Sequence, residues 1–124
     1  MSDSPQGPGW WQASDGMWYS RMWRRMRGIP DDEYVDPARE NWLSRVHPED
    51  VARIEANVGR QERGDDGFDI LEYREKTRDG RWIWILSRGQ PVEWDAAGNP
   101  LRSVGTDTDI TRFKAAEAAL ADEK

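Results

Sequence analysis

The sequence predicts an α+β domain in which short helices cover one face of an antiparallel sheet. Strand-like runs separated by turn signals lie at both ends of the chain, and helix-like patterns fill the stretch between them. Strands at both ends with helices between them favour a single sheet with a helical layer on one face. The length of 124 residues fits one domain.

Order is expected to begin near Gly9, after a lead over 1–8 that is rich in Ser, Pro and Gly and that we predict to be disordered. The runs WWQA and MWYS flank the turn sequence SDG and predict a hairpin of two short strands. Ser20 can then cap a short helix that ends at Gly28. The inner side of this helix is expected to carry Met22, Trp23 and Met26.

The same helix carries a cluster of four arginines: Arg21, Arg24, Arg25 and Arg27. Charge runs on helices usually face water, and the whole chain has a net charge of −6, so we expect these side chains to form the solvated side of the helix. The acidic balance also argues against a general affinity for nucleic acid, because phosphate binding requires a surplus of Lys and Arg.

Further helical pieces are expected in the middle of the chain. The polar stretch 31–40 predicts a turn or a brief helix, and 41–46 predicts a brief helix with its apolar residues inward. Pro48 fits the first position of a clearer helix that should stop by Gly64. The repeating apolar face of that helix consists of Val51, Ile54 and Val58.

Three strand-like runs follow, at 68–77, 81–94 and 101–109, and predict an antiparallel meander. Both faces of the middle run are apolar, because one alternating set holds Ile83 and Ile85. The other set holds Trp82, Trp84 and Leu86. A single helical layer cannot cover both, so we expect a flanking helix or a second copy of the protein on the outer face.

The last strand runs directly into a helix that begins near Thr111. Asp109 or Thr111 is expected to accept backbone N–H groups there, which makes the junction a stiff joint. Phe113, Ala116 and Leu120 then recur at heptad-like spacing, which favours a narrow seam against a second helix. About a dozen helical residues are marginal alone in water, so this helix needs a partner. The competing interpretation is a frayed C-terminal tail.

Composition excludes several functions. The chain has no cysteine, which rules out disulfides, thiolate metal sites and a thiol nucleophile. No apolar run approaches the roughly 20 residues that cross a bilayer, and the start lacks the features of a signal peptide. We therefore expect a soluble cytoplasmic protein that does not insert into membranes.

Three segments together carry a family resemblance: WLSRVHPEDVARI, EYREKTRDGRWIWI and DAAGNPLRSVGTDTDITRFKAAEAAL. Their order and spacing resemble a bacterial PAS domain with its C-terminal PAC motif, also called a sensory box. The resemblance implies a five-stranded antiparallel sheet, helices on one face that enclose a possible ligand pocket, and frequent dimerisation. PAS domains usually carry a helix before the first strand, whereas this chain has a Pro/Gly-rich lead there.

The resemblance also implies a domain layout and a route of output. A PAS/PAC sensor domain would span 9–110, and 111–124 would form a linker helix to an effector. Family effectors are histidine kinases of two-component systems, diguanylate cyclases and further PAS domains. The residues expected to transfer the signal are Asp109, Ile110, Thr111, Phe113 and Leu120.

His47 is the one histidine and lies in the sequence HPED, which indicates a helix start. Metal sites need several convergent donors, so we interpret His47 as structural, and no metal or other cofactor is inferred. Its match is to the common HPED motif of PAS domains and not to their haem-binding helix, which disfavours haem. Flavin photochemistry of the light-sensing relatives requires a cysteine and is excluded.

The carboxylates allow few other roles. Asp107 and Asp109 share a strand face and could hold a divalent ion, but neighbouring aspartates at a strand end are more often turn or cap residues. Glu72 and Arg74 share a face and are expected to pair with each other or line the pocket. The sequence shows no catalytic triad, phosphate loop or acid–base pair, so we expect no enzyme activity.

Two classes of function remain open. In the first, the chain is a sensory and dimerisation module, and an unidentified small molecule, or nothing, occupies a pocket between helices and sheet. Its expected lining, where each residue could equally be plain core, is Trp23, Met26, Trp42, Ile54, Val58 and Tyr73. In the second, some of the eight tryptophans form an exposed platform that binds a sugar or another planar ligand.

Overall fold

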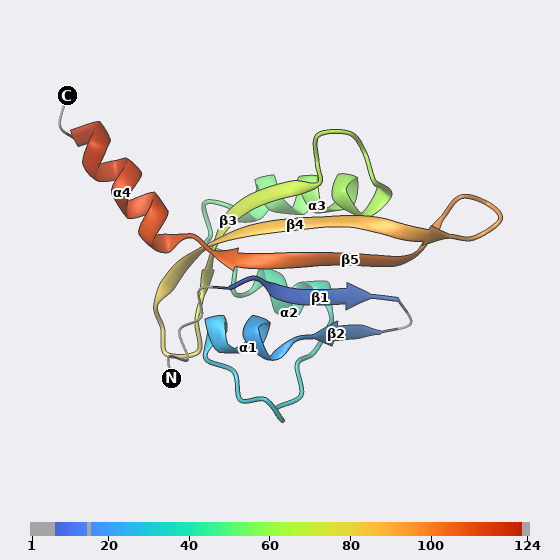
Figure 1. Cartoon of the computed structure of the whole chain (residues 1–124), viewed down its shortest axis with the longest axis horizontal. Helices are drawn as coiled ribbons and strands as arrows, with labels where there is room; N and C mark the ends of the chain where they lie inside the picture. Colours follow the sequence, from blue (N-terminus) through green and yellow to red (C-terminus); the bar gives the residue numbers. More distant parts are fainter. Residues whose placement is uncertain (1–6, 15, 123–124) are drawn as a thin grey trace.

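The chain forms one five-stranded antiparallel sheet with the strand order β2-β1-β5-β4-β3 (Figure 1). The structure is a computed structural model that describes residues 7–14 and 16–122, so most of the predicted disordered lead lies outside the described residues. The five strands are β1 (Gly9–Ala13), β2 (Met17–Tyr19), β3 (Ile70–Lys76), β4 (Trp82–Trp94) and β5 (Pro100–Asp109). The predicted α+β fold class is confirmed.

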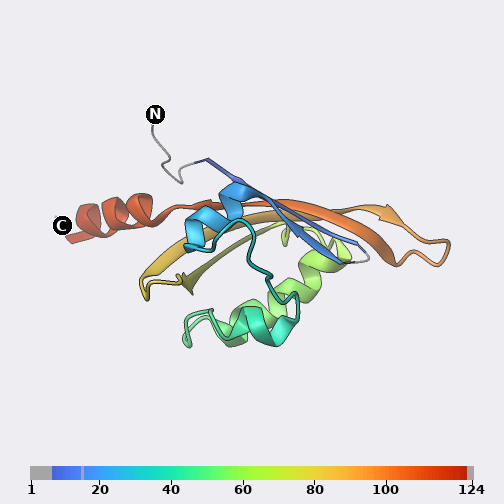
Figure 2. The ribbon, with the colours of Figure 1, turned by 90° about the horizontal axis from the view of Figure 1, so that it is seen from below.

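Three helices lie on one side of the sheet. They are α1 (Arg21–Arg27), α2 (Arg39–Leu43) and α3 (Val51–Arg63). Figure 2 shows α2 and α3 beneath one face, and α1 packs beside β1 on that side. The fourth helix, α4 (Thr111–Asp122), extends away from the end of β5. Within residues 7–14 and 16–122, none of the helices has the length and apolar character needed to cross a bilayer.

The helix ends follow the capping residues in the sequence. The Ser20 hydroxyl accepts a hydrogen bond from the Trp23 backbone N–H at 3.2 Å, which confirms the predicted cap of α1. Gly28 and Gly64 close α1 and α3 in the left-handed conformation, with φ values of 74° and 76°.

Two helix boundaries differ from the prediction. The longer helix begins at Val51 rather than at Pro48, because residues 48–50 form a turn in which the Asp50 N–H donates to the His47 carbonyl at 2.8 Å. The brief helix expected over 41–46 lies earlier, at Arg39–Leu43, because Val46 instead forms an isolated β-bridge with Glu75 of β3.

The core lies between the inner face of the sheet and the helices. Its buried apolar members are Met26, Val46, Ile54, Leu71, Tyr73, Ile83 and Ile85. In β4 the isoleucines point inward, whereas Trp82, Trp84 and Leu86 lie on the outer face. The inner face therefore supplies the core and the cavity described next, and an apolar outer face is left toward solvent.

Candidate functional site

A cavity of about 680 Å³ lies between the inner face of the sheet and the helical layer. This volume is in the range of small-molecule sites. Five aromatic rings form much of its wall: Trp11, Tyr19, Trp23, Trp42 and Tyr73. Its rim is formed by exposed and half-buried residues of the β1–β2 hairpin, α2, α3 and the start of β5.

The structure brings four of the six predicted pocket residues to this cavity. Trp23, Trp42, Val58 and Tyr73 line its wall, whereas Met26 and Ile54 lie in the packed core. Sequence reasoning missed Trp11 and Tyr19. The alternation of Gly9, Trp11 and Ala13 along β1 was a detectable signal. These residues share one face of the strand, and the small side chains of Gly9 and Ala13 indicate that this is the crowded inner face.

Two glycines make room for the Trp11 indole on the inner face. Gly105 pairs with both Trp11 and Gly89 across the sheet, so the two glycines lie side by side. A Cβ atom added at Gly89 would lie 2.6 Å from the Trp11 ring, and one at Gly105 would also meet that ring. The indole therefore lies directly against the backbone of β4 and β5 as part of the cavity wall.

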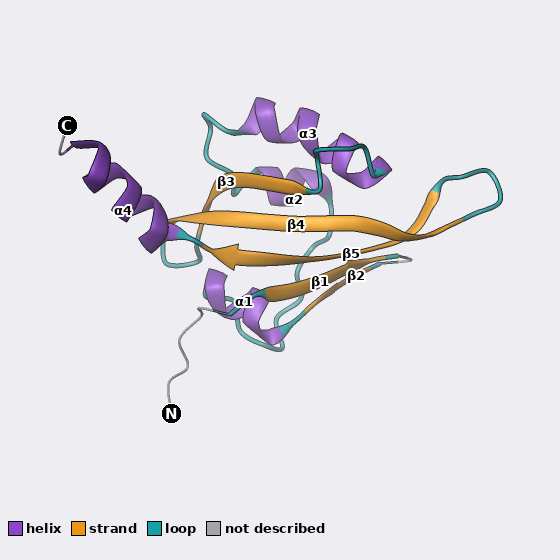
Figure 3. Ribbon diagram, turned by 45° about the horizontal axis from the view of Figure 1, so that its top comes forward, coloured by secondary structure: helices purple, strands orange, loops and turns teal. Residues whose placement is uncertain are grey.

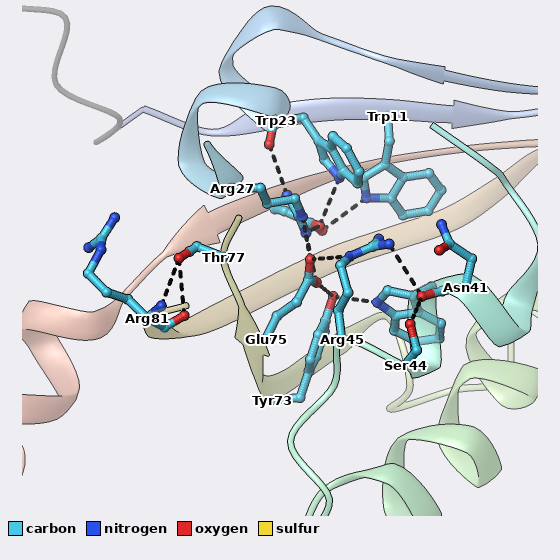
Figure 4. Close-up of polar contacts among 12 residues, drawn as sticks. Trp11, Trp23, Arg27, Asn41, Ser44, Arg45, Tyr73, Glu75, Thr77 and Arg81 are labelled. Atoms are coloured by element: carbon cyan, nitrogen blue, oxygen red, sulfur yellow. Dashed lines mark hydrogen bonds and ion pairs between the residues drawn. The ribbon is translucent and has the colours of Figure 1, made fainter. Parts of the chain in front are cut away.

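Arg27 lies at the centre of a buried ion cluster. Its Nε lies 2.7 Å from Glu75 Oε2 (Figure 4). Its Nη2 lies 2.7 Å from Asp107 Oδ2. Arg27 is 1% exposed, Glu75 0% and Asp107 4%. The prediction that all four arginines of this helix face solvent is therefore wrong for Arg27. The reason is its position four residues after Trp23, which puts both side chains on the same inward face of α1.

The cluster is tolerated because its polar atoms are hydrogen-bonded. The Tyr73 hydroxyl donates to Glu75 Oε1 at 3.3 Å, and Arg45 Nε lies 3.3 Å from Glu75 Oε2. The indole N–H groups of Trp11 and Trp23 donate to the Asp107 carboxylate at 3.1 and 3.2 Å. The Trp42 indole extends the network by donating to the Tyr73 hydroxyl at 3.3 Å.

Charge pairing outweighs burial for Glu75 and Arg27. Burial alone would raise the pKa of Glu75, but the nearby Arg27 and Arg45 guanidinium groups outweigh it and hold the pKa below its usual value. Burial likewise opposes the charge of Arg27, yet Glu75 and Asp107 raise its pKa. Burial raises the pKa of Tyr73 and of Tyr19, so both phenols are neutral.

Asp107 and Asp109 have different roles, although the sequence suggested turn or cap positions for both. That suggestion is wrong for Asp107, since this carboxylate is drawn inward by Arg27. It is confirmed for Asp109, whose Oδ1 accepts the Thr111 N–H at 3.0 Å and the Thr111 hydroxyl at 2.5 Å.

The junction between β5 and α4 is hydrogen-bonded to Trp84 of β4. The Ile110 N–H donates to the Trp84 carbonyl at 2.9 Å, and the Trp84 N–H donates to the Thr111 hydroxyl at 3.0 Å. Figure 3 shows β5 leading into α4 through a short connection. The last strand and the last helix are thus joined without a free loop.

The first turn of α4 also contacts the outer face of the sheet. Lys114 Nζ lies 2.7 Å from Glu72 Oε1 and 4.8 Å from the centroid of the Trp84 ring. Arg74 instead pairs with Asp50 at 2.9 Å. The prediction that Glu72 and Arg74 pair with each other or line the pocket is therefore wrong. Both lie on the outer face, where Glu72 pairs with Lys114 and Arg74 pairs with Asp50.

The remaining predicted residues lie away from the cavity. Phe113 and Leu120 of α4 are each 65% exposed. His47 Nδ1 accepts the Glu49 N–H at 3.1 Å, and its ring lies 4.7 Å from the Trp82 ring. These contacts give His47 a part in the turn that precedes α3.

The fold and the cavity define a class of protein: a small single-sheet domain with one helical layer over an aromatic, ligand-sized space, and a terminal helix fixed to its last strand. Residues 17–107 match the PAS fold family. The chain belongs to this family, and it is a bacterial PAS sensory domain.

Solved structures support this assignment. A sensory box histidine kinase/response regulator from Burkholderia thailandensis is 34% identical, with a TM-score of 0.74 and coverage of 94% of this chain and 86% of that chain. The N-terminal domain of a diguanylate cyclase with PAS/PAC sensor from Marinobacter aquaeolei is 24% identical, with a TM-score of 0.71 and coverage of 87% and 99%. An RNA-binding light-oxygen-voltage receptor, at 16% identity, a TM-score of 0.67 and coverage of 97% and 34%, shares the fold alone.

A curated relative is much longer than this chain. The uncharacterized protein y4lL of Sinorhizobium fredii is 32% identical over 105 residues, which are 81% of this chain and 12% of the relative. The chain thus spans about an eighth of the length of that protein.

Proposed function

We propose that this PAS domain is a cytoplasmic sensory and dimerisation module that passes the state of its cavity to an effector through α4. Histidine kinase and diguanylate cyclase effectors are favoured because the two relatives described above combine PAS domains with those activities. In this function the protein binds and relays, and catalysis belongs to the effector.

The proposal rests mainly on β5, because this strand supplies both a hydrogen-bond acceptor for the cavity rings and the residue that caps α4. Asp107 of β5 accepts the indole N–H groups of two cavity rings and the guanidinium of Arg27. Two residues later, Asp109 accepts the first N–H of α4. A ligand that moves either indole changes the hydrogen bonds of Asp107, and β5 carries that change to the start of α4.

The dimerisation part of the proposal rests on exposed apolar side chains. Phe113 and Leu120 lie on one side of α4 at a spacing of seven residues, and both are exposed. The outer face of the sheet presents further apolar side chains to solvent, namely Trp10, Trp18, Ile70 and Trp82. A second copy that packs along α4 and this face would cover both sets.

A single spin label on α4 tests the relay. Because the chain has no cysteine, Ala118→Cys gives one labelling site on the side of α4 that lies away from Phe113 and Leu120. Double electron–electron resonance then measures the distance between the two labels of a dimer. We expect Asp107→Asn, and the milder Trp11→Phe, to shift or broaden this distance while the circular dichroism spectrum is retained.

The exposed Asp66→Asn serves as the matched control and should leave the distance unchanged. An unchanged distance in both cavity variants would contradict the relay. A labelled protein that stays monomeric up to hundreds of micromolar would contradict the dimerisation part alone.

One observation supports the alternative function, in which exposed tryptophans form a platform that binds a sugar or another planar ligand. Trp10 and Trp18 are both more than half exposed, and the pairing of β1 with β2 puts them on the same outer face. If this pair binds a sugar, Trp18→Ala will abolish binding and Trp42→Ala in the cavity will not.

A further inference from the structure

The cavity has a chemical preference that follows from its charges and hydrogen bonds. We infer that it takes a planar, uncharged aromatic molecule with one hydrogen-bonding edge, held between ring faces. This inference rests on the proposed sensory function, because it names the kind of molecule that the sensor detects.

The charges of the ion cluster beside the cavity sum to zero. Two guanidinium groups, Arg27 and Arg45, face two carboxylates, Glu75 and Asp107, within 3.3 Å or less for each ion pair. A charged ligand would enter without a free counter-ion, and burying an unpaired charge is strongly unfavourable. The wall therefore favours an uncharged molecule.

The rim offers no better partner for a charged group. Among the described rim residues, Arg39 pairs with Glu62 at 2.7 Å and Arg102 pairs with Glu93 at 2.9 Å. Arg63 also pairs, with Asp65 at 3.1 Å. A ligand anion at the rim would have to displace one of these carboxylates.

One aromatic ring of the wall already binds a cation of the protein. Trp23 already carries the Arg27 guanidinium 3.9 Å from its ring and stacks on Tyr19 at a centroid distance of 3.8 Å. The Trp23 face is thus occupied by a cation of the protein itself, which leaves less of the aromatic wall for a ligand cation.

The edges of the rings are also engaged. The indole N–H groups of Trp11, Trp23 and Trp42 all donate within the protein. The rings consequently offer apolar faces rather than donors, which favours a flat aromatic ligand that stacks. A sugar would bring many hydroxyl groups that need partners and would leave most of them unpaired.

Hydroxyl groups of the cavity wall, among them those of Tyr19 and Ser87, remain available for one edge of the ligand. Tyr19 and Ser87 both line the cavity, and in residues 7–14 and 16–122 neither hydroxyl makes a hydrogen bond. Ser87 is 6% exposed and lines the cavity, so a partner for its hydroxyl would have to come from the cavity. A ligand with an amide, phenol or ring-nitrogen edge would satisfy both groups.

Three probes with the same ring and different charges test the inference: indole-3-acetamide, which is neutral, indole-3-acetate, an anion, and tryptamine, a cation. Each is titrated at pH 7 into the full chain, and the indole N–H signals are followed by ¹H–¹⁵N correlation NMR. Trp11→Phe and Trp42→Phe identify the cavity signals, and Trp18→Phe identifies an outer-face signal. We expect the acetamide to shift the cavity signals with a Kd at least about tenfold lower than either charged probe, equivalent to about 1.4 kcal/mol.

The Tyr19→Phe variant separates the hydroxyl contact from stacking. It should raise the Kd for the acetamide about two- to tenfold, in keeping with one hydrogen bond. The outer-face variant Trp18→Phe should leave it unchanged. The inference is overturned if a charged probe binds as tightly as the acetamide, if the shifts fall on Trp18, or if none of the three probes binds at millimolar concentration.

The same titration distinguishes failure of the inference from failure of the sensory function. Saturable binding of the acetamide without any shift of α4 amide signals would contradict the relay and leave the ligand class standing. Preferred binding of a charged probe that does shift α4 signals would contradict the ligand class and leave the relay standing.

Discussion

At the scale of single residues, Arg27 shows how a charge can belong to the core. It joins α1 to β3 through Glu75 and to β5 through Asp107, so one side chain connects three elements that lie far apart in the sequence. Removing one partner of a buried ion pair leaves an uncompensated charge, which costs about 3–5 kcal/mol. The cluster therefore makes α1 and the sheet depend on each other.

We predict that Arg27→Met lowers the free energy of unfolding by about 3–5 kcal/mol, because it leaves two buried carboxylates without their cation. Arg21→Met, on the same helix but with an exposed ion pair to Asp31, should cost less than about 1 kcal/mol. Urea unfolding followed by tryptophan fluorescence measures both. A loss below about 1 kcal/mol for Arg27→Met would contradict the account of the cluster.

The second residue-scale prediction concerns Asp50 and acid stability. Hydrogen bonds from Arg74, through its backbone N–H at 2.9 Å and its Nε at 3.0 Å, lower the pKa of Asp50 to about 2, although burial opposes them. The unfolded carboxyl has a pKa of about 3.9. The folded value is the lower one, so the stabilisation is complete above about pH 5 and is lost as the pH falls toward 2.

We therefore expect Asp50→Asn to flatten the dependence of the melting temperature on pH below about pH 5 and to lower that temperature at pH 7. Asp66→Asn, an exposed position, should leave the slope as it is in the unsubstituted protein. Calorimetric melts between pH 3 and pH 7 make the comparison. An Asp50→Asn protein with an unaltered acid slope would show that the Arg74 contact does not set the pKa.

Residue periodicity predicts most of the inner face but not its charges. The alternation of β4 and the capping sequences at Ser20, Gly28 and Gly64 define the elements without any knowledge of tertiary contacts. The inward position of Arg27 could have been read from its spacing to Trp23. Its carboxylate partners could not, because Glu75 and Asp107 meet it only through the strand order of the folded sheet.

At the scale of elements, the glycines of β4 and β5 decide how the cavity wall is built. The Trp11 indole can lie against these strands because neither Gly89 nor Gly105 has a side chain. The sequence predicts the strands, and the small residues Gly9 and Ala13 indicate that Trp11 faces inward, but nothing in β1 indicates that a glycine pair lies beneath its ring.

We predict that Gly89→Ala destabilises the domain by about 1–3 kcal/mol, the usual cost of overpacking. The added methyl would lie 2.6 Å from the Trp11 ring. In a Trp11→Val background the same change should cost almost nothing, so a double-mutant cycle gives a coupling energy of similar size. Urea unfolding of the four proteins provides the measurement.

Gly59→Ala in α3 is the matched control for this cycle. Its new methyl would meet only the flexible end of Arg63, at 3.6 Å, and we expect a gain of about 0.5–1 kcal/mol from helix propensity. Additive effects of Gly89→Ala and Trp11→Val would mean that the indole does not occupy the space above Gly89.

At the scale of the whole molecule, the two faces of the sheet serve different purposes. The inner face holds the core, the ion cluster and the cavity, whereas the outer face meets solvent with several large apolar side chains. The last helix, α4, is linked to residues of both faces. It is capped from β5, which carries the cavity residue Asp107, and its first turn contacts Glu72 and Trp84 on the outer face.

This arrangement makes α4 the element through which association and sensing would be coupled. We predict that Phe113→Ser combined with Leu120→Ser weakens self-association at least about tenfold, because each change removes an apolar side chain of the kind that a coiled-coil seam buries. Monomer stability should be almost unaffected, since both side chains are 65% exposed in the single chain. Sedimentation equilibrium measures the association, and thermal melts at low concentration measure stability.

The control is Ala115→Ser combined with Ala118→Ser, at exposed positions on the opposite side of α4. These changes introduce polarity into the same helix without touching the seam, so self-association should be retained. Equal weakening by both pairs would mean that helix propensity, rather than a seam, determines association. Unchanged association in the Phe113/Leu120 variant would place the contact between copies on the outer face of the sheet, and Trp18→Ser would then be expected to disrupt it.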